Sequence, residues 1–509
     1  MKAYLGIDIG TSAVKSIVLT EKGHILGSGS SDFDVVVPKP GYAEQNPEDW
    51  WNGTVISIKA ALDSCTTKPE VVAIGVTGQM VGSVLMDSDG KADEQCIIWM
   101  DQRASKECEY IKNKLGEETI LDRTANIAFV SLWAPKLLWL RENDPERYSR
   151  IEKVLFPKDY IKYRLTGEYD IDVSDSTSTL LFNTAERRWE PSLFEKLDIP
   201  RSFVPGEASE SSEIIGHLSS HISDLLGLPK GIPVVSGGGD QLCGAAGLGI
   251  VRSGLVSSTI GTSGVVFAYS DSCLTDRMGR AIICNCHCIP DAWGIYGCTL
   301  AAGGSYKWLR DILLKSNDEQ SYYTYEVMNS MAAEVKPGCE GLLFLPYLSG
   351  ERTPHADPYS RGVFFGLSQR SATADICRAV MEGVTYSLRD TIEAFKEYGI
   401  PVTQVRVAGG GARSGLWRQL QADIFGAEVV LTNVIESTAT GAAMLGAVGI
   451  GDYADMEQAA DDIVQVIEKC EPNYENMQLY NDFYETYRDL YPAIRSLYES
   501  QAKKVEKWN

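Results

Sequence analysis

The chain has 509 residues, of which 44% are hydrophobic and 23% charged, and an excess of acidic residues gives a formal charge of −22. This composition is typical of a globular protein of two to four domains, and its negative surface disfavours nucleic acid as a partner. No run of about 18 apolar residues predicts a membrane span. The first strand pattern begins without a secretory signal, and twelve scattered cysteines form no disulfide framework, so we expect a cytoplasmic protein with no membrane partner.

Residues 4–20 predict a β-hairpin whose tight turn carries Asp8, Thr11 and Ser12, with Lys15 shortly after it. Backbone amides and hydroxyls in such a turn can cradle a phosphate, and the acid can hold Mg²⁺ through a water molecule. As an isolated hairpin turn, the segment would be unremarkable.

Residues 71–76 predict a strand that leads into Gln79, and the segment 97–103 follows. Polar groups on Gln79, Asp101 and Arg103 beside an aromatic wall can hydrogen-bond a polyol. The alternative is a surface ion pair of Asp101 with Arg103.

The helix that follows begins near a proline at residue 135. It carries an apolar stripe, and we expect its Lys136 to be structural.

Residues 232–247 contain an apolar run, three glycines, Asp240 and then small residues, which predicts a strand, a turn and a closely packed helix. A carboxylate fixed where a strand becomes a helix is suited to act as a general base. This segment alone favours the simpler interpretation, in which Asp240 caps the helix.

The string Ile9-Gly10-Thr11-Ser12 recurs as Ile260-Gly261-Thr262-Ser263, again between β-rich runs. Its position at the start of each half predicts a duplicated domain, with two turns that grip a polyphosphate across a cleft between two α/β lobes. We expect an N-terminal domain over residues 1–249 and a C-terminal domain over residues 250–509.

In the second half, residues 302–311 predict a helix with a glycine-lined face, and the strand 405–408 leads into Gly409-Gly410-Gly411. Both surfaces can admit a ribose or a flat ring, although the spacing of a dinucleotide fingerprint is missing. Residues 374–398 predict a long amphipathic helix, and residues 474–509 a charged terminal helix that packs outside the core. The alternation of cysteines over residues 284–288 favours a core strand over a zinc site.

Taken in order, these motifs resemble the FGGY family of carbohydrate kinases, within the actin, hexokinase and Hsp70 superfamily, over residues 3–455. The resemblance is carried by two phosphate motifs, the Asp240 segment, an adenosine motif and the C-terminal signature: residues 8–15, 260–264, 237–247, 409–414 and 362–382. It implies an α/β fold of two ribonuclease H-like domains around a central cleft.

Within the family, residues 41–45, 78–80 and 350–354 most resemble the xylulokinases. Val81 stands where those enzymes have a histidine that contacts the ketose, and Met100 replaces an asparagine. Trp133 departs from the N-terminal signature of the whole family, which usually has a small residue or proline there. A lost polar contact can change which sugar is accepted. The resemblance implies ATP-dependent phosphorylation of a ketopentose, D-xylulose first, with ribulose, fuculose, gluconate, erythritol and glycerol open.

The resemblance also implies roles for the candidate residues. Asp240 would be the catalytic base, and Asp8 would hold Mg²⁺ through water. The implied sugar contacts are Gln79, Met80, Val81, Trp99, Asp101 and Gln241. The implied ATP contacts are Thr11, Ser12, Lys15, Gly261, Thr262, Gly303, Lys307, Gly410, Gly411 and Ala412. A homodimer is the alternative to a monomer.

Two other classes of protein compete with a kinase. A conformational ATPase of the Hsp70 or actin type would need a peptide- or polymer-binding appendage, which we do not find after residue 455. A sugar sensor without catalysis is disfavoured because Asp8, Asp240 and both phosphate turns are kept.

Overall fold

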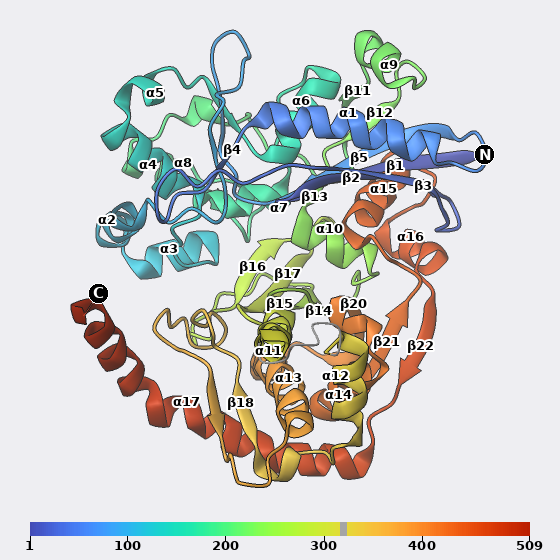
Figure 1. The fold of residues 1–509 in the computed structure, drawn as a ribbon. Helices are drawn as coiled ribbons and strands as arrows, with labels where there is room; N and C mark the ends of the chain where they lie inside the picture. The colour runs from blue at the N-terminus through green and yellow to red at the C-terminus, as the bar shows by residue number, and fades with distance from the viewer. Residues whose placement is uncertain (316–322, 509) are drawn as a thin grey trace.

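The computed structural model describes residues 1–315 and 323–508, which form two α/β lobes, one above the other in Figure 1. The N-terminal sheet has the strand order β11-β12-β5-β1-β2-β3, and β13 pairs with β5. Its strands are β1 (Lys2–Ile9), β2 (Ala13–Thr20), β3 (Ile25–Asp32), β5 (Glu70–Gly78), β11 (Ile214–His217), β12 (Pro233–Val235) and β13 (Gly238–Gly239).

The C-terminal sheet has the strand order β16-β17-β15-β14-β20-β21-β22. Its strands are β14 (Gly254–Ile260), β15 (Gly264–Ser270), β16 (Ile283–Cys286), β17 (Trp293–Thr299), β20 (Val402–Gly409), β21 (Glu428–Thr432) and β22 (Val466–Cys470). Short pairs of strands lie outside both sheets: β4 (Glu44–Gln45) with β7 (Cys96–Ile97), β6 (Val84–Met86) with β8 (Lys153–Leu155), β9 (Phe182–Asn183) with β10 (Arg188–Trp189), and β18 (Leu343–Leu345) with β19 (Val363–Phe365).

Both sheets are built on the same plan. In each, a hairpin is extended on one side by two parallel strands and an antiparallel edge strand, and on the other by antiparallel pairing, with β3 in the first sheet and with β17 and β16 in the second. The recurring sequence string forms the turn of each hairpin, with Ile9 opposite Val14 and Ile260 opposite Gly264. The predicted duplication of an α/β domain is therefore confirmed.

Helices surround the sheets (Figure 1). Those of the first half are α1 (Pro47–Asp63), α2 (Ser105–Leu115), α3 (Glu117–Thr124), α4 (Trp133–Asn143), α5 (Pro145–Ser149), α6 (Pro157–Thr166), α7 (Val173–Ser176), α8 (Pro191–Leu197), α9 (Ser220–Leu226) and α10 (Asp240–Gly247). Those of the second half are α11 (Gly303–Lys315), α12 (Tyr325–Glu334), α13 (Thr373–Glu397), α14 (Gly415–Phe425), α15 (Ser437–Gly449), α16 (Met456–Ile463) and α17 (Tyr474–Trp508). Among the described helices, none combines the length and apolar character needed to cross a membrane.

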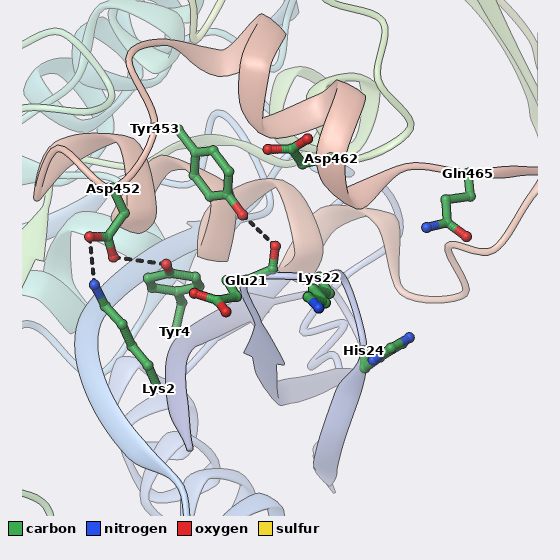
Figure 2. A pocket seen from close by; sticks show the side chains of 9 residues that line it. All are labelled: Lys2, Tyr4, Glu21, Lys22, His24, Asp452, Tyr453, Asp462 and Gln465. Carbon is green, nitrogen blue, oxygen red and sulfur yellow. Dashed lines mark hydrogen bonds and ion pairs between the residues drawn. The ribbon is translucent and has the colours of Figure 1, made fainter.

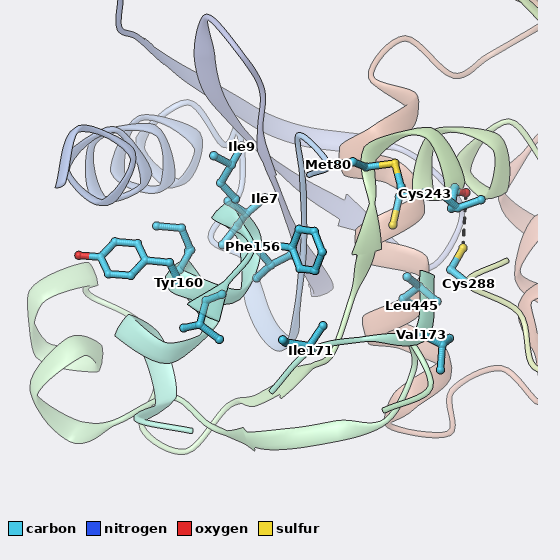
Figure 3. Close-up of a cluster of buried hydrophobic side chains, with 14 of the residues drawn as sticks. Ile7, Ile9, Met80, Phe156, Tyr160, Ile171, Val173, Cys243, Cys288 and Leu445 are labelled. Atoms are coloured by element: carbon cyan, nitrogen blue, oxygen red, sulfur yellow. Dashed lines mark hydrogen bonds between the residues drawn. The ribbon is translucent and has the colours of Figure 1, made fainter. Parts of the chain in front are cut away.

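Helices α10 and α15 pack against each other between the lobes, and α15 also covers β1 and β5. These contacts depend on glycine: a Cβ added at Gly6 would lie 2.0 Å from the Ala439 oxygen, and one added at Gly441 would lie 2.0 Å from the Cys243 oxygen. Leu445 of α15 and Cys243 of α10 therefore belong to the same hydrophobic core as strand β1 (Figure 3). A helix late in the sequence thus completes the core of the first lobe.

The terminal helix α17 corrects one sequence prediction, because it does not pack outside the core. Tyr480 and Tyr487 are fully buried in the core of the C-terminal lobe. The Tyr480 hydroxyl donates to Glu382 Oε1 at 2.8 Å, and the Tyr484 hydroxyl donates to Asp390 Oδ1 at 2.7 Å. Tyrosine allows this arrangement because its ring is apolar and only its tip needs a polar partner.

Candidate active site

Asp8 lies near the end of β1, where the first hairpin turns. Its Oδ2 atom accepts a hydrogen bond from the Thr438 hydroxyl, so the turn is tied to the start of α15. Its Oδ1 atom is buried and has no hydrogen-bond partner among the described residues, and burial raises the pKa of the carboxyl group. A free carboxylate oxygen beside turn amides suits a hard cation such as Mg²⁺, which prefers oxygen ligands.

Asp240 is the first residue of α10 and follows the two-residue strand β13, which pairs with the end of β5. The N-cap residue of α10 is Gly239, so the interpretation of Asp240 as the helix cap is wrong. Desolvation, and secondarily the charge of Asp8, raise the pKa of Asp240 to about 7. A partly exposed carboxyl group with this pKa can take up a proton near neutrality.

The hydrogen bond from the Gly239 amide to the Ser174 hydroxyl, 3.0 Å long, anchors the turn before Asp240. On its other side, Gln241 Nε2 lies 3.5 Å from Asp240 Oδ1, so Gln241 is adjacent to the carboxylate.

The structure brings several of the predicted sugar contacts to the Asp8 turn. Gln79 follows β5, is buried and donates from Nε2 to Gln45 Oε1 at 2.8 Å. Trp99 is 43% exposed and donates from its indole nitrogen to the Thr11 hydroxyl at 2.9 Å. Met80 and Val81 are largely buried. The turn and the two segments that follow β5 and β7 therefore meet at one place.

Asp101 forms the ion pair with Arg103 that the sequence offered as an alternative, but the pair is buried and not on the surface. Arg103 Nη2 lies 2.7 Å from both Asp101 Oδ2 and Glu44 Oε1, and the Ala43 amide donates to Asp101 Oδ2 at 2.7 Å. With these partners Asp101 holds the loop in place, and its carboxylate is 1% exposed.

A pocket of about 420 Å³ opens in the C-terminal lobe beside the second hairpin turn. Six of the predicted ATP contacts line it: Gly261, Thr262, Gly303, Lys307, Gly410 and Gly411. Aromatic and amide side chains that the sequence did not single out complete the wall: Tyr306, Tyr325, Asn329 and Trp417. A glycine-lined slot with aromatic walls can hold a flat ring and a ribose.

The remaining predicted ATP contacts lie outside this pocket. Thr11, Ser12 and Lys15 belong to the first hairpin, and Ala412 is buried beside Gly411. The Lys15 ammonium lies 3.0 Å from Glu436 Oε2, so in this arrangement it pairs with an acid from the second half. Lys307 pairs with Asp311 at 2.6 Å at the rim of the pocket.

Three residues of this region were not among the contacts predicted from the sequence. Thr438 holds Asp8, and Tyr296 on β17 is close enough for the charge of Asp240 to raise its pKa, although burial is the larger cause. The Arg352 guanidinium lies beside the Cys298 thiol and 5.8 Å from the centre of the Phe129 ring, which belongs to the other lobe. Only Arg352 had a sequence signal, since it lies in the motif 350–354.

A second hollow, of about 500 Å³, lies at the opposite end of the β1–β2 hairpin from Asp8 (Figure 2). Its floor is closed by an ion pair between Lys2 and Asp452 at 2.5 Å and by the Tyr4 hydroxyl, which donates to Asp452 at 2.8 Å. Neither glycine-rich turn reaches it. The candidate site for a reaction therefore comprises the region of Asp8 and Asp240 and the glycine-lined pocket of the C-terminal lobe.

The geometry agrees with the comparison to known proteins. Models of the N-terminal and C-terminal domains of the FGGY family of carbohydrate kinases match residues 3–247 and 256–450. The chain therefore belongs to the FGGY family of carbohydrate kinases.

Within the family, the chain is similar to several xylulose kinases. The chain is 37% identical to a xylulose kinase of Staphylococcus epidermidis over 94% of both chains, and 35% identical to that of Bacillus subtilis over 95% of this chain and 96% of the relative. Its fold matches the crystal structure of a xylulose kinase from Rhodospirillum rubrum with a TM-score of 0.89 at 28% identity, over 98% of this chain and all of that one. The resemblance to xylulokinases that the sequence motifs indicated is confirmed.

Proposed function

We propose that this kinase transfers the γ-phosphoryl group of ATP to a hydroxyl of a ketopentose, with D-xylulose as the substrate and D-xylulose 5-phosphate as the product. The observation that carries this proposal is the position of Asp240. It begins a helix between the lobes, has a pKa of about 7 and lies within electrostatic range of Asp8. The xylulose kinases among the relatives support the choice of sugar.

In this mechanism Asp240 accepts the proton of the sugar hydroxyl as the hydroxyl oxygen attacks the γ-phosphorus. Phosphoryl transfer needs positioning and charge stabilisation more than covalent help from the protein. Thr11, Ser12, Gly261 and Thr262 are placed on the two hairpin turns to donate hydrogen bonds to the β- and γ-phosphates. Asp8 would hold Mg²⁺, whose charge offsets that of the phosphates when it is bound.

The two substrates would occupy the two sides of this arrangement. The adenosine fits the glycine-lined pocket formed by Gly303, Gly410 and Gly411. The sugar would lie against Met80, Val81, Trp99 and Gln241, next to Asp240, with Gln79 and Asp101 supporting those segments from behind. Cleft closure over both substrates would exclude water and limit hydrolysis of ATP.

We also propose that the reaction takes place in the cytoplasm. All twelve cysteines are free thiols, which fits a reducing compartment.

A coupled assay of ADP release with a panel of ketopentoses, aldopentoses, polyols and sugar acids tests the substrate. We expect D-xylulose to give the highest kcat/KM and ATP turnover without sugar to be slow. If ribulose, fuculose, gluconate, erythritol or glycerol gave a higher kcat/KM than D-xylulose, that compound would be the substrate instead. ATP turnover that no sugar accelerates would contradict the kinase reaction itself.

A further inference from the structure

The first turn of α4 grips the loop that follows β5. The Trp133 indole nitrogen donates to the Gly82 oxygen at 3.0 Å, and the Lys136 ammonium donates to the Val81 oxygen at 2.7 Å. The two side chains are three residues apart and so project from the same face of the helix. Consecutive carbonyl groups of the loop are thus held from one side.

The Lys136 ammonium also connects this loop to a second one. It donates to the Ile97 oxygen at 3.2 Å, and Ile97 lies two residues before Trp99. The Ser83 amide donates to the same Ile97 oxygen at 3.1 Å. One buried cation therefore joins the segments 79–82 and 97–101, which carry all of the proposed sugar contacts except Gln241.

Lys136 is an unusual residue for a purely structural role. Its side chain is fully buried, and within residues 1–315 and 323–508 no carboxylate forms an ion pair with it. Desolvation lowers the pKa of its ammonium to about 7. A buried cation is unfavourable unless it is compensated, and here it is compensated by the backbone carbonyl groups of Val81 and Ile97 and by the nearby charge of Asp101.

The loop that Lys136 and Trp133 hold is strained. Val81 has φ of +59°, a left-handed conformation that is an outlier for a β-branched residue. Such backbone strain persists only where surrounding contacts over-determine it. Here those contacts are the two donors on α4 and Pro157, whose ring would lie 2.6 Å from a Cβ at Gly82.

The loop also touches the residue that precedes the catalytic base. A Cβ added at Gly239 would lie 2.8 Å from Met80 Cγ, so the Met80 side chain packs directly on Gly239 (Met80 is drawn in Figure 3). The position of Met80 is set by the conformation of the loop at Val81 and Gly82. The hydrogen bonds from α4 to this loop therefore also affect the position of Met80 next to Gly239, the residue that precedes Asp240.

We propose that Lys136 and Trp133 form a positioning pair that fixes both sugar-facing segments and so determines how well, and which, sugar binds. This inference rests on the proposed sugar kinase reaction and deepens it. Neither residue touches the reacting atoms. Their effect falls on the sugar and not on the nucleotide, whose pocket lies in the other lobe.

The test compares Lys136→Met, Lys136→Gln and Trp133→Phe with the wild-type chain. Lys136→Met removes the donors at similar length, and Lys136→Gln restores one amide donor. Trp133→Phe removes the indole N–H but keeps a ring to stack on Phe156, whose centroid lies 4.0 Å from that of Trp133. Lys153→Met is the matched control, because the Lys153 ammonium also donates to a carbonyl at 2.7 Å, but this carbonyl belongs to Ser202, which lies in neither of the two segments.

We expect Lys136→Met to raise the KM for D-xylulose about tenfold or more while the KM for ATP stays within twofold, since a lost buried hydrogen bond to a charged group has an effect of this order. Lys136→Gln should recover part of the loss, Trp133→Phe should raise the sugar KM about threefold to fivefold, and Lys153→Met should change neither KM. The ratio of kcat/KM between xylulose and ribulose should fall in both Lys136 variants.

Unchanged sugar KM values in Lys136→Met and Trp133→Phe would overturn the inference. A fall in kcat and melting temperature together with a rise in both KM values would also overturn it, because these changes indicate general destabilisation. If Lys136→Met does not fold, Trp133→Phe and Lys136→Gln keep the test valid. Sugar phosphorylation by the wild-type chain separates this inference from the proposed function. If it phosphorylates no sugar, the proposed function fails, whereas wild-type activity with unaltered variants refutes only the positioning pair.

Discussion

Each lobe has a corner formed by the end of its first strand and the end of the neighbouring parallel strand, and the two corners carry different chemistry. In the N-terminal lobe, β1 ends at Ile9 beside Gly78 of β5. In the C-terminal lobe, β14 ends at Ile260 beside Gly409 of β20. The chain after Gly78 supplies side chains for the proposed sugar site, whereas the chain after Gly409 supplies bare glycine backbone for the adenosine pocket.

The hairpins differ in the same way. Asp8 in the first lobe corresponds to Thr259 in the second, because both precede the recurring Ile-Gly-Thr-Ser string. Only the first corner therefore brings a carboxylate next to Asp240. Duplication therefore supplied two similar backbone arrangements, and a few side chains gave them different roles. The first corner carries the charged groups proposed for proton transfer, and the second forms the glycine-lined pocket proposed for adenosine.

The largest effect should come from removing the base in the charged corner. Asp240→Asn keeps the size of the side chain but cannot accept a proton, so sugar-dependent kcat should fall about 10³-fold. Mg-ATP binding, measured by titration calorimetry, should be retained. Turnover within tenfold of wild type would show that another group serves as the base.

The second largest effect on kcat should come from replacing Asp8, the acid that only the first corner contains. Asp8→Asn should lower kcat about 10²-fold, because charge neutralisation at the phosphates is weakened. Thr259→Val, at the matching position of the other lobe, is the control and should change kcat less than twofold. Steady-state assays at saturating substrates compare the two. Equal losses in both variants would mean that the corners are not specialised.

The pH profile gives the third test. Asp240 must be ionised to act as a base, and its pKa is raised to about 7, so kcat/KM should fall about tenfold per pH unit below pH 7 and level off above it. The charge of Asp8 contributes to this shift, so Asp8→Asn should move the acid limb to lower pH. An acid limb near pH 4 in the wild type would contradict the assignment.

The smallest expected effect comes from adding a side chain in the glycine-lined corner of the C-terminal lobe. In Gly411→Ala the new Cβ would meet Ile260 side-chain atoms at 2.7 Å, which should distort the pocket wall and raise the KM for ATP about tenfold. Gly410→Ala is the control, since its nearest neighbour would be 3.8 Å away. The sugar KM should stay constant in both. A larger effect in Gly410→Ala than in Gly411→Ala would show that the contact with Ile260 is not what limits ATP binding.

Much of this arrangement could be predicted from the sequence because it is local. The recurring turn, the strand and glycines before Asp240, and the helix at 374–398, found as α13, are set by short-range patterns of apolar residues and glycine. The recurrence of the turn predicted two α/β lobes, and the resemblance of the ordered motifs to a known family implied the ribonuclease H-like fold.

What the sequence did not reveal depends on contacts between distant segments. The hydrogen bond of Thr438 to Asp8 spans 430 residues, and burial of the Asp101–Arg103 pair depends on Glu44. The tyrosines of α17 looked like part of a charged surface helix, because their burial is visible only when their acidic partners on α13 are known.

The packing of α15 on the first sheet has a consequence for biosynthesis. On the ribosome, strand β5 emerges about 360 residues before α15, the helix that covers both β5 and β1, which at about 5–20 residues per second is a delay of roughly 20–70 s. During that interval the glycine-lined face of the nascent first lobe has no cover. Completion of that lobe must wait for the second to be translated, so the two mature together.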